Sequence, residues 1–552
     1  MQIRKEKNNL IITFDYNPIV IEIVKKFDNR KFDVKTKEWS VPCLHVKKVL
    51  DILMPMGFKP TPDVLDIYQR KVKYDLRIEN ILDKKLEPEI DNRIKTTGLP
   101  LFDYQKLGVN FLEVTKSSIL GDEPGTGKSL QSLTCTEIND MKKVLIVCPS
   151  SLKLNWRDEI IKWLKIKEEQ IVIIDGPKKK RDIAWNQEEK FFIMNYELLL
   201  KDIDEIKKIY WDVIIADEAT RISNPRAKQA QAIKKIPAKR KYALTGTPLN
   251  NSIQDIWSIL DFCQPKLLGS YWHFIDKYCV KDFFGNVSGY KNLGELKEMI
   301  QQYMIRRPKS EVLKELPELM YENIYVEFTT KERQIYNALK EEIIAELKEN
   351  EVLAFSNLKN ALVKMVRLKQ ATGSLELISN YTISSKIFIL KELLKDILHD
   401  DSKVLIYTQF AEMAKILERE LNEYKPLLII GEVDLKQRNA NIIKFTDKDE
   451  NKVMILTEAG NYGLNLQRAK YMIHYDLPWS ISKIEQREGR AHRQGQTNKV
   501  TVFNLLVQDS IDEYILKILQ RKQNMSEGML GDKEKIKKVK ITKKELRKIL
   551  EV

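Results

Sequence analysis

A glycine-rich segment at 121–129, GDEPGTGKS, offers the first residues whose types and spacing could do chemistry. It follows a short apolar run and opens a helical pattern. A strand, a glycine loop and a helix N-terminus make a phosphate cradle, because free backbone N–H groups converge on the anion. In such a loop Lys128 reaches the β- and γ-phosphates and Ser129 holds Mg²⁺. Asp122 stands where the strict pattern has glycine, so a chance glycine turn is the alternative.

An acidic pair further along the chain, Asp217 and Glu218, ends the apolar run 213–216. Ligands bind at the carboxyl ends of parallel strands. There Asp217 can hold Mg²⁺ through water, and Glu218 can orient or deprotonate an attacking water. The alternative is an acidic strand-to-helix turn, which the phosphate loop upstream disfavours.

Two arginines in the segment 486–496, Arg490 and Arg493, are three residues apart and would share one face of a helix. Phosphoryl transfer spreads charge over the γ-phosphate oxygens, and an arginine delivered from elsewhere can stabilise that charge. A solvated arginine-rich turn is the alternative for this segment.

Short apolar runs that alternate with helical patterns predict the elements that position these residues. The first set of runs lies at 119–120, 144–148, 171–174, 191–194, 213–216 and 242–244. A second set lies at 404–407, 427–430, 453–456, 471–475 and 500–506. Such runs suit buried parallel strands, so the chain is predicted to form two doubly wound α/β lobes.

The alternation of apolar runs with helical patterns also predicts the domain boundaries. We expect a small basic α+β unit with a linker at 1–95, a first lobe at 96–250 and a second lobe at 386–525. Between the lobes, 251–385 is predicted to hold helical insertions and a connector, with helices at 331–349 and 355–370. Residues 526–552 form a basic tail.

Composition narrows the class of protein. The 552 residues are 43% hydrophobic and carry a net charge of +15, which excludes a disordered chain and favours a polyanion partner, although a generally lysine-rich proteome explains the charge equally well. Five cysteines without a C-x-x-C pair predict reduced packing residues rather than disulfides or zinc. No stretch of about 20 apolar residues occurs, so we expect no membrane association and a cytoplasmic location.

The order of the motifs resembles the Swi/Snf family of superfamily-2 helicase-like DNA translocases over about residues 100–510. Residues 104–105 resemble the family's adenine-reading motif, and 125–129 resemble motif I, where Asp122 is usual. The further motifs Ia to VI match at 147–156, 195–197, 217–220, 244–251, 404–410, 457–466 and 486–496. Arg306-Arg307 followed by Leu316-Pro317 resembles an inter-lobe signature. Thr220 and Asn461 depart from the family, which favours His and Gly there.

The resemblance implies two RecA-like lobes that bind ATP and Mg²⁺ between them and act on duplex or forked DNA without reading its sequence. It implies nucleotide binding by Phe102, Gln105, Gly125, Thr126, Gly127, Lys128 and Ser129. It implies catalysis by Lys128, Asp217, Glu218, Arg490 and Arg493, with Ser129 and Asp217 as metal ligands. The sequence identifies no protein partner.

The first 50 or so residues resemble the HARP-type module of annealing helicases. Tyr16-Asn17-Pro18 and 39–42 carry much of this similarity, which implies binding of branched DNA. Phosphate contacts would come from Lys25, Lys26, Arg30, Lys31 and Lys35. We therefore expect a DNA-stimulated ATPase that remodels or reanneals forks. The alternatives are an ATPase that acts on a protein–nucleic-acid complex such as RNA polymerase on DNA, and a binding protein with a degenerate ATPase fold.

Overall fold

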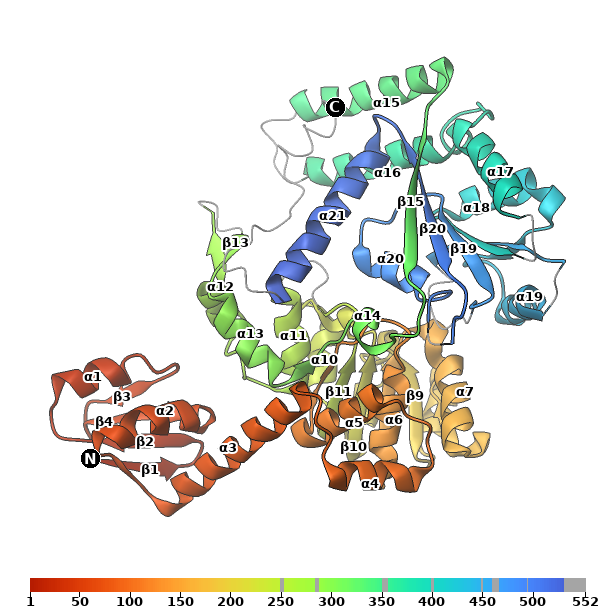
Figure 1. Ribbon diagram of the computed structural model, residues 1–552. Helices are drawn as coiled ribbons and strands as arrows, with labels where there is room; N and C mark the ends of the chain where they lie inside the picture. Colours follow the sequence, from red (N-terminus) through yellow and green to blue (C-terminus); the bar gives the residue numbers. More distant parts are fainter. Residues whose placement is uncertain are drawn as a thin grey trace. The chain divides into compact units, whose positions relative to one another are not determined.

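The computed structural model describes residues 1–248, 253–282, 287–349, 356–398, 402–447, 450–458, 466–493 and 495–530 (Figure 1). The chain divides into two compact units, Met1–Arg93 with Glu113–Thr115, and Ile94–Leu112 with Lys116–Val552. Of the predicted motifs, 249–251, 459–465 and Gln494 lie outside the described residues, as does the basic tail from residue 531 onward.

The N-terminal unit is a five-stranded mixed sheet with helices, in the order β3-β4-β2-β1-β5. Its strands are β1 (Gln2–Glu6), β2 (Asn9–Thr13), β3 (Lys31–Asp33), β4 (Glu38–Pro42) and β5 (Lys59–Pro60). Its helices are α1 (Pro18–Val24), α2 (Val46–Leu53) and α3 (Pro62–Leu82). The side chain of Asn17 caps α1 by accepting from the amides of Ile19 and Val20, and Pro18 suits the first helical turn. The charged stretch expected as a linker or exposed helix is helical, in α3 and in α4 (Pro88–Thr97).

The first lobe is built on a seven-stranded sheet in which every pair is parallel, in the order β14-β6-β11-β10-β7-β9-β8. The strands are β6 (Ser118–Leu120), β7 (Val144–Cys148), β8 (Ile171–Ile173), β9 (Phe191–Asn195), β10 (Trp211–Asp217), β11 (Ala238–Leu244) and β14 (Met304–Ile305). All six predicted runs form strands of this sheet. The two-residue strand β14 is too short for a sequence pattern to reveal.

Helices cover this sheet and supply its connections. They are α5 (Asp103–Thr115), α6 (Lys128–Ile138), α7 (Lys153–Leu164), α8 (Lys178–Trp185), α9 (Ile203–Lys208), α10 (Lys228–Lys234) and α11 (Ile253–Cys263). An insertion follows with α12 (Tyr271–Tyr278), an antiparallel hairpin of β12 (Cys279–Lys281) and β13 (Val287–Tyr290), and α13 (Leu293–Gln301).

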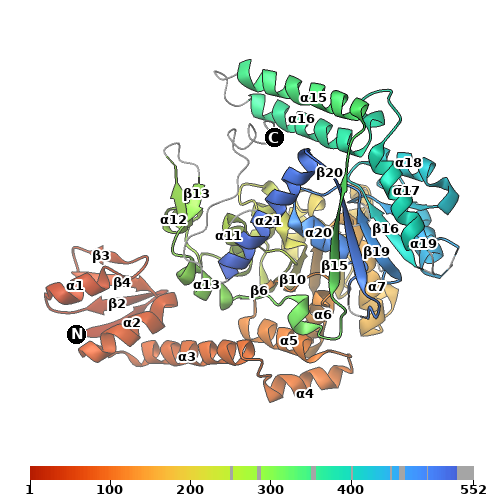
Figure 2. The ribbon, with the colours of Figure 1, turned by 45° about the horizontal axis from the view of Figure 1, so that its top comes forward.

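The second lobe is a six-stranded parallel sheet in the order β15-β20-β19-β16-β18-β17 (Figure 2). Its strands are β15 (Leu319–Val326), β16 (Lys403–Tyr407), β17 (Leu427–Ile429), β18 (Val453–Leu456), β19 (Ala469–His474) and β20 (Val500–Val507). The five predicted runs are confirmed as strands. The interpretation of 251–385 as helical insertions is wrong for β15, which pairs with β20 along its full length. Its sequence, LMYENIYV, lacks a buried run because an edge strand leaves most of its side chains exposed.

The helices of the second lobe include the two long ones predicted between the lobes. They are α15 (Thr330–Glu349), α16 (Ser356–Gly373), α17 (Ser385–Ile397), α18 (Ala411–Glu420), α19 (Leu435–Asp447), α20 (Ile481–Glu488) and α21 (Ile511–Leu530). The short helix α14 (Lys309–Val312) lies in the connection between β14 and β15. Figure 2 shows α15 and α16 side by side.

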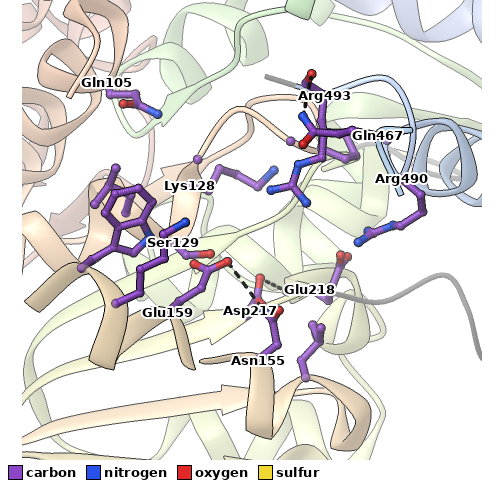
Figure 3. A pocket seen from close by; sticks show the side chains of 18 of the residues that line it. Gln105, Lys128, Ser129, Asn155, Glu159, Asp217, Glu218, Gln467, Arg490 and Arg493 are labelled. Carbon is purple, nitrogen blue, oxygen red and sulfur yellow. Dashed lines mark hydrogen bonds between the residues drawn. The ribbon is translucent and has the colours of Figure 1, made fainter. Parts of the chain in front are cut away.

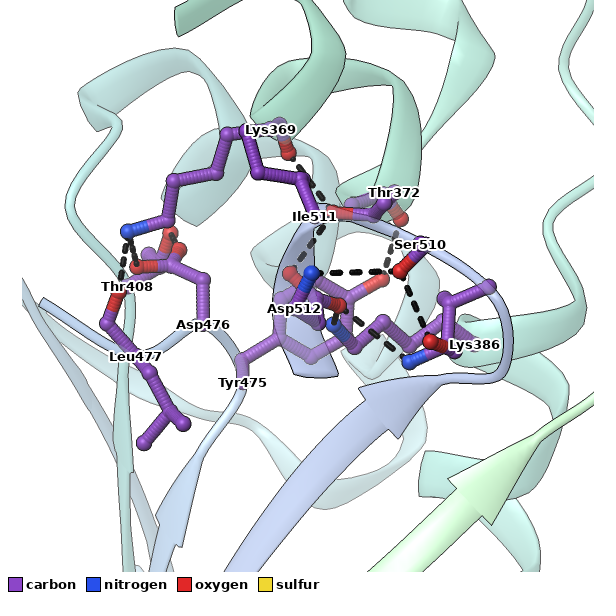
Figure 4. A network of polar contacts seen from close by, with 12 residues as sticks. Lys369, Thr372, Lys386, Thr408, Tyr475, Asp476, Leu477, Ser510, Ile511 and Asp512 are labelled. Carbon is purple, nitrogen blue, oxygen red and sulfur yellow. Dashed lines mark hydrogen bonds and ion pairs between the residues drawn. The ribbon is translucent and has the colours of Figure 1, made fainter. Parts of the chain in front are cut away.

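Buried ion pairs fasten α16, α17 and α21 to the second sheet (Figure 4). Lys386 Nζ donates to Asp512 Oδ2 at 2.7 Å, and Thr372 donates to the other oxygen of Asp512 at 3.0 Å. Lys369 lies 3.6 Å from Asp476, the second residue after β19 ends. Buried charges are tolerated because each has a partner, so these pairs specify how the helices sit on the sheet.

The five cysteines are all free and four of them are buried, which fits their prediction as packing residues. Among the described residues, no helix has both the length and the apolar character needed to cross a membrane.

Candidate functional site

A cavity of about 350 Å³ lies where the carboxyl ends of the first lobe's strands face the turn after α20 (Figure 3). It is lined by the phosphate loop, by the acidic pair and by both arginines. Of the predicted site residues, those that line it are Gln105, Gly125, Gly127, Lys128, Ser129, Asp217, Glu218, Arg490 and Arg493. Folding therefore brings together three motifs that are far apart in the sequence.

The phosphate loop joins β6 to α6, and its shape depends on glycine at two positions. Gly125 and Gly127 have φ angles of +87° and +79°, a region that side chains disfavour. A Cβ on Gly127 would lie 2.4 Å from Gln105 Nε2. Thr126 is buried, and its hydroxyl donates to the Glu123 carbonyl at 2.8 Å, which closes the loop on itself.

Lys128 is the first residue of α6, and its ammonium group is held by the loop that precedes it. Its Nζ donates to the Asp122 carbonyl at 2.7 Å and to the Glu123 carbonyl at 3.3 Å. Burial lowers the pKa of Lys128, while the carboxylates of Glu218, Asp122 and Asp217 act in the opposite direction. The lysine is thus a half-buried cation placed beside the acidic pair.

The acidic pair stands at the end of β10. Asp217 accepts a hydrogen bond from Trp156 Nε1 at 2.8 Å and one from the Glu218 amide at 2.9 Å. Glu218 has a φ of +50°, which is unusual for a residue with a side chain and is typical of functional turns. Burial and the charge of Asp217 raise the pKa of Glu218 to about 7, and burial also raises the pKa of Asp217.

The donor set suits Mg²⁺ bound together with phosphates. Ser129 and Asp217 offer hard oxygen ligands. Burial raises the pKa values of Asp217 and Glu218, and a divalent cation would stabilise their ionised forms. In the part of the chain that the structure describes, no cluster of three or more His, Cys, Asp or Glu could hold a metal alone. Mg²⁺ commonly binds through one or two carboxylates plus substrate phosphates, which matches this arrangement.

The two arginines reach the cavity from the turn after α20. The expectation that they share a helix face is wrong, because α20 ends at Glu488 and both follow it. Arg490 Nε donates to the Gln486 carbonyl at 3.1 Å. A Cβ on Gly125 would lie 3.0 Å from Arg493 Cβ, so the arginine segment packs closely on the phosphate loop.

Of Phe102, Gln105 and Thr126, all expected to bind the nucleotide, only Gln105 lines the cavity. Gln105 is buried; its Nε2 donates to the Thr126 carbonyl at 3.1 Å, and its Oε1 accepts from the Phe102 amide at 3.0 Å. Phe102 does not line the cavity; its ring is 48% exposed and stacks on Tyr104 at 6.0 Å between centroids. Thr126 is buried behind the loop rather than facing the cavity.

Helix α7 forms a wall of the cavity that sequence analysis identified only in part. Asn155, Glu159, Lys162 and Trp163 line it there, and of these only Asn155 belongs to a predicted motif, at 147–156. Burial raises the pKa of Glu159, while Arg493 and Ser129 oppose this rise. The spacing of positions 155, 159 and 162 puts them on one helix face, but such spacing is common and does not by itself indicate a ligand site.

Two side-chain contacts join the lobes near the cavity. Gln486 Nε2 donates to Glu218 Oε2 at 3.3 Å, and Thr247 donates to the Ser482 hydroxyl at 2.9 Å. The acidic pair of the first lobe therefore touches the helix that leads into the arginine segment. Two parallel α/β lobes with a phosphate loop between them define a two-lobed RecA-like protein.

Comparison with known proteins supports the same class. The family model for the SNF2-related domain matches residues 104–377, and that for the helicase conserved C-terminal domain matches 385–495. The two matched segments contain the phosphate loop, the acidic pair and both arginines of the cavity.

Relatives share this core at modest identity. An uncharacterised ATP-dependent helicase of Mycoplasma genitalium, MG018, is 28% identical over 478 residues, 84% of this chain and 45% of the relative. The putative ATP-dependent helicase/translocase YwqA of Bacillus subtilis is 28% identical over 482 residues, 82% of this chain and 50% of the relative. The chain thus spans about half the length of these relatives. The solved SWI2/SNF2 ATPase core of Sulfolobus solfataricus with dsDNA is 28% identical, covers 81% of this chain and 96% of its own, and has a TM-score of 0.38.

Proposed function

We propose that the protein hydrolyses ATP between its two lobes and uses the energy to translocate on duplex or forked DNA, which it remodels or reanneals. The observation that carries the proposal is the cavity itself. There Lys128 and the acidic pair of one lobe face Arg490 and Arg493 of the other. This combination is what phosphoryl transfer needs, since its transition state is stabilised mainly by positioned charges.

Each residue has a distinct role in the proposed hydrolysis. The phosphate loop binds the triphosphate through its amides, and Lys128 exchanges its carbonyl partners for the β- and γ-phosphates. Bound Mg²⁺, held by Ser129 and Asp217, would neutralise charge on the phosphate oxygens. Glu218 orients the attacking water and accepts its proton, and its raised pKa suits proton transfer near neutral pH.

The arginines complete the site from the second lobe. Their guanidinium groups would stabilise charge on the γ-phosphate, and only when the lobes are closed around the nucleotide. The contact between Gln486 and Glu218 forms only when the lobes are close together, and Gln486 lies four residues before Arg490. Closure that makes this contact therefore also brings Arg490 to the acidic pair. Hydrolysis removes the phosphate that the arginines bind, so it favours reopening. Alternate closing and opening, with each lobe holding one stretch of DNA backbone, would move the protein along the duplex.

The match to the SNF2-related domain, the names of the relatives and the net charge of +15 support DNA as the partner. We further propose that the N-terminal unit is a HARP-like module that favours branched DNA. Its support is a set of exposed cations that follow α1 and surround β3, which could contact phosphates without reading bases: Lys25, Lys26, Arg30, Lys31 and Lys35.

The test of the main proposal measures ATP hydrolysis alone and with duplex DNA, single strands, forked DNA or duplex RNA. We expect strong stimulation by duplex or forked DNA, and at least a 100-fold loss of turnover in Glu218→Gln with nucleotide still bound. Stimulation by RNA alone would contradict the choice of substrate. Turnover in Glu218→Gln at the wild-type rate would contradict the proposed site.

The test of the N-terminal unit compares two triple variants that remove the same charge. One replaces Lys25, Lys26 and Lys31 with alanine, and the control replaces three exposed lysines of the first lobe, Lys167, Lys179 and Lys207. We expect the first to lose its preference for forked over linear duplex and the control to keep it. Equal losses would show that charge alone, rather than this unit, sets the preference.

A further inference from the structure

The chain between β14 and β15 runs beside the phosphate loop before it enters the second lobe. The Gly121 amide donates to the Ile305 carbonyl at 2.7 Å, and the Glu123 amide donates to the Arg307 carbonyl at 3.4 Å. We call residues 305–317 the strap. Through these bonds the strap continues the edge of the first sheet along the phosphate loop.

Arg307 anchors the strap to the loop. Its backbone amide and its Nε donate to Asp122 Oδ1 at 3.0 and 3.1 Å, and its guanidinium also binds the Tyr104 carbonyl. Asp122 is fully buried and Arg307 nearly so. This end of the strap therefore moves with the first lobe.

Two residues further on, Lys309 connects the strap to the arginine segment. Its amide donates to Glu123 Oε2 at 3.0 Å, and its Nζ donates to the His492 carbonyl at 2.8 Å. The lysine is 9% exposed. His492 directly precedes Arg493, and its ring Nε2 lies 2.7 Å from the Pro317 carbonyl at the far end of the strap. The strap thus contacts the backbone and the side chain of one residue next to Arg493.

The charges around Lys309 come from both lobes. Glu123 of the loop and Glu488 of α20 favour its charged form, while Lys128 and Arg490 oppose it. Burial lowers the pKa of Lys309 to about 8, so it still carries the proton with which it binds the His492 carbonyl at neutral pH. A buried ammonium group with a backbone acceptor gains an interaction stronger than a neutral hydrogen bond.

We propose that Lys309 is a positioning residue that holds the His492 backbone so that Arg493 faces the phosphate loop. Lys309 does not line the cavity, so it acts through Arg493, which does. Its role in turnover rests on the proposed ATP hydrolysis, but its role in ordering the arginine segment does not.

The test replaces Lys309 with Met and uses Lys314→Met as the matched control, because Lys314 is an exposed lysine on the same strap. The first readout is hydrogen exchange of the amides at 490–493 without nucleotide. In Lys309→Met we expect at least tenfold faster exchange there, since local opening is no longer resisted by the strap. The second readout is ATP hydrolysis with duplex DNA, where we expect kcat to fall at least tenfold with KM changed less than twofold.

A double-variant cycle with Arg493→Ala isolates the mechanism. If Lys309 acts through Arg493, Lys309→Met should slow Arg493→Ala no further, whereas independent roles give multiplied losses. Lys309→Arg keeps a cationic donor and should return kcat to within threefold of wild type. If circular dichroism shows that Lys309→Met does not fold, Lys309→Gln, which also loses the charged donor, takes its place.

Unchanged exchange at 490–493, multiplied losses in the cycle, or equal effects of Lys309→Met and Lys314→Met would each overturn the proposal. Wild-type protein that hydrolyses no ATP with any DNA would instead contradict the proposed function. The exchange result stands apart from that outcome, so the two failures are distinguishable.

Discussion

Replacing Arg307 with Met should destabilise the first lobe more than the loss of any exposed ion pair. Arg307 supplies the cation for Asp122, which has no exposed surface. The variant leaves that carboxylate buried with only the backbone amide of residue 307 and removes the donor to the Tyr104 carbonyl. Asp122 stands at the start of the phosphate loop, so the loop should lose its fixed position as well.

The size of the effect follows from burial. Breaking a buried ion pair by removing one partner costs about 3–5 kcal/mol, because an uncompensated charge stays in the interior. Removing both charges, in Arg307→Met with Asp122→Asn, avoids that penalty. We therefore expect the double variant to be at least about 2 kcal/mol more stable than the sum of the single losses. The control, Arg221→Met, breaks a half-exposed pair with Glu197 and should cost below about 1 kcal/mol.

The assay is urea unfolding followed by the fluorescence of Trp156, Trp185 and Trp211, which are buried in the first lobe. Nucleotide affinity, measured with a fluorescent ATP analogue, should fall in parallel in Arg307→Met. A loss in Arg307→Met below about 1 kcal/mol would refute the reasoning, since buried pairs cost more than that when broken. Strict additivity in the double variant would refute it too.

Three further changes have expected outcomes. Gly127→Ala should weaken binding of the ATP analogue at least tenfold, because the new Cβ would lie 2.4 Å from Gln105 Nε2. The control is Gly98→Ala, which also has a positive φ but no atom within 4 Å of the new Cβ. It measures the backbone cost alone and should keep wild-type affinity. Burial and Arg487 lower the pKa of His474 to about 3, so the unfolded chain binds the extra proton below pH 6.5 and stability falls as pH falls. Urea midpoints should show that wild type loses about 2 kcal/mol more than His474→Asn between pH 6.5 and 5, and equal losses would contradict this. Asp217→Asn should raise the Mg²⁺ concentration for half-maximal hydrolysis at least tenfold, and an unchanged requirement would exclude Asp217 as a ligand.

Most strands of both sheets could be predicted, and the reason is local. A strand buried on both faces reads as a continuous apolar run, so 144–148 and 453–456 are visible without any tertiary information. β15 was missed because it lies at an edge, where exposed Met320 and Tyr321 erase the pattern that burial imposes. Its assignment to the second sheet depends on pairing with β20, which lies far along the chain.

The site divides in the same way. The phosphate loop and the acidic pair could be predicted because each is a contiguous motif that follows an apolar run. The helical conformation expected for Arg490 and Arg493 was wrong, because spacing alone does not say where α20 ends. Glu159 was missed because a carboxylate on a helix is usually a solvated side chain, and only the tertiary structure shows that this one faces a cavity.

The sequence by itself determined the order of elements, the residues of the phosphate loop and the acidic pair, and the resemblance to the Swi/Snf family. These are properties of short segments, because burial and backbone geometry restrict which residue types can follow one another there. Only the tertiary structure decided that β15 joins the second sheet, that Phe102 stands outside the cavity, and that Lys309 meets His492. Such contacts join residues far apart in the chain, and the burial that raises the pKa of Glu218 depends on the whole fold, so no local pattern can encode them.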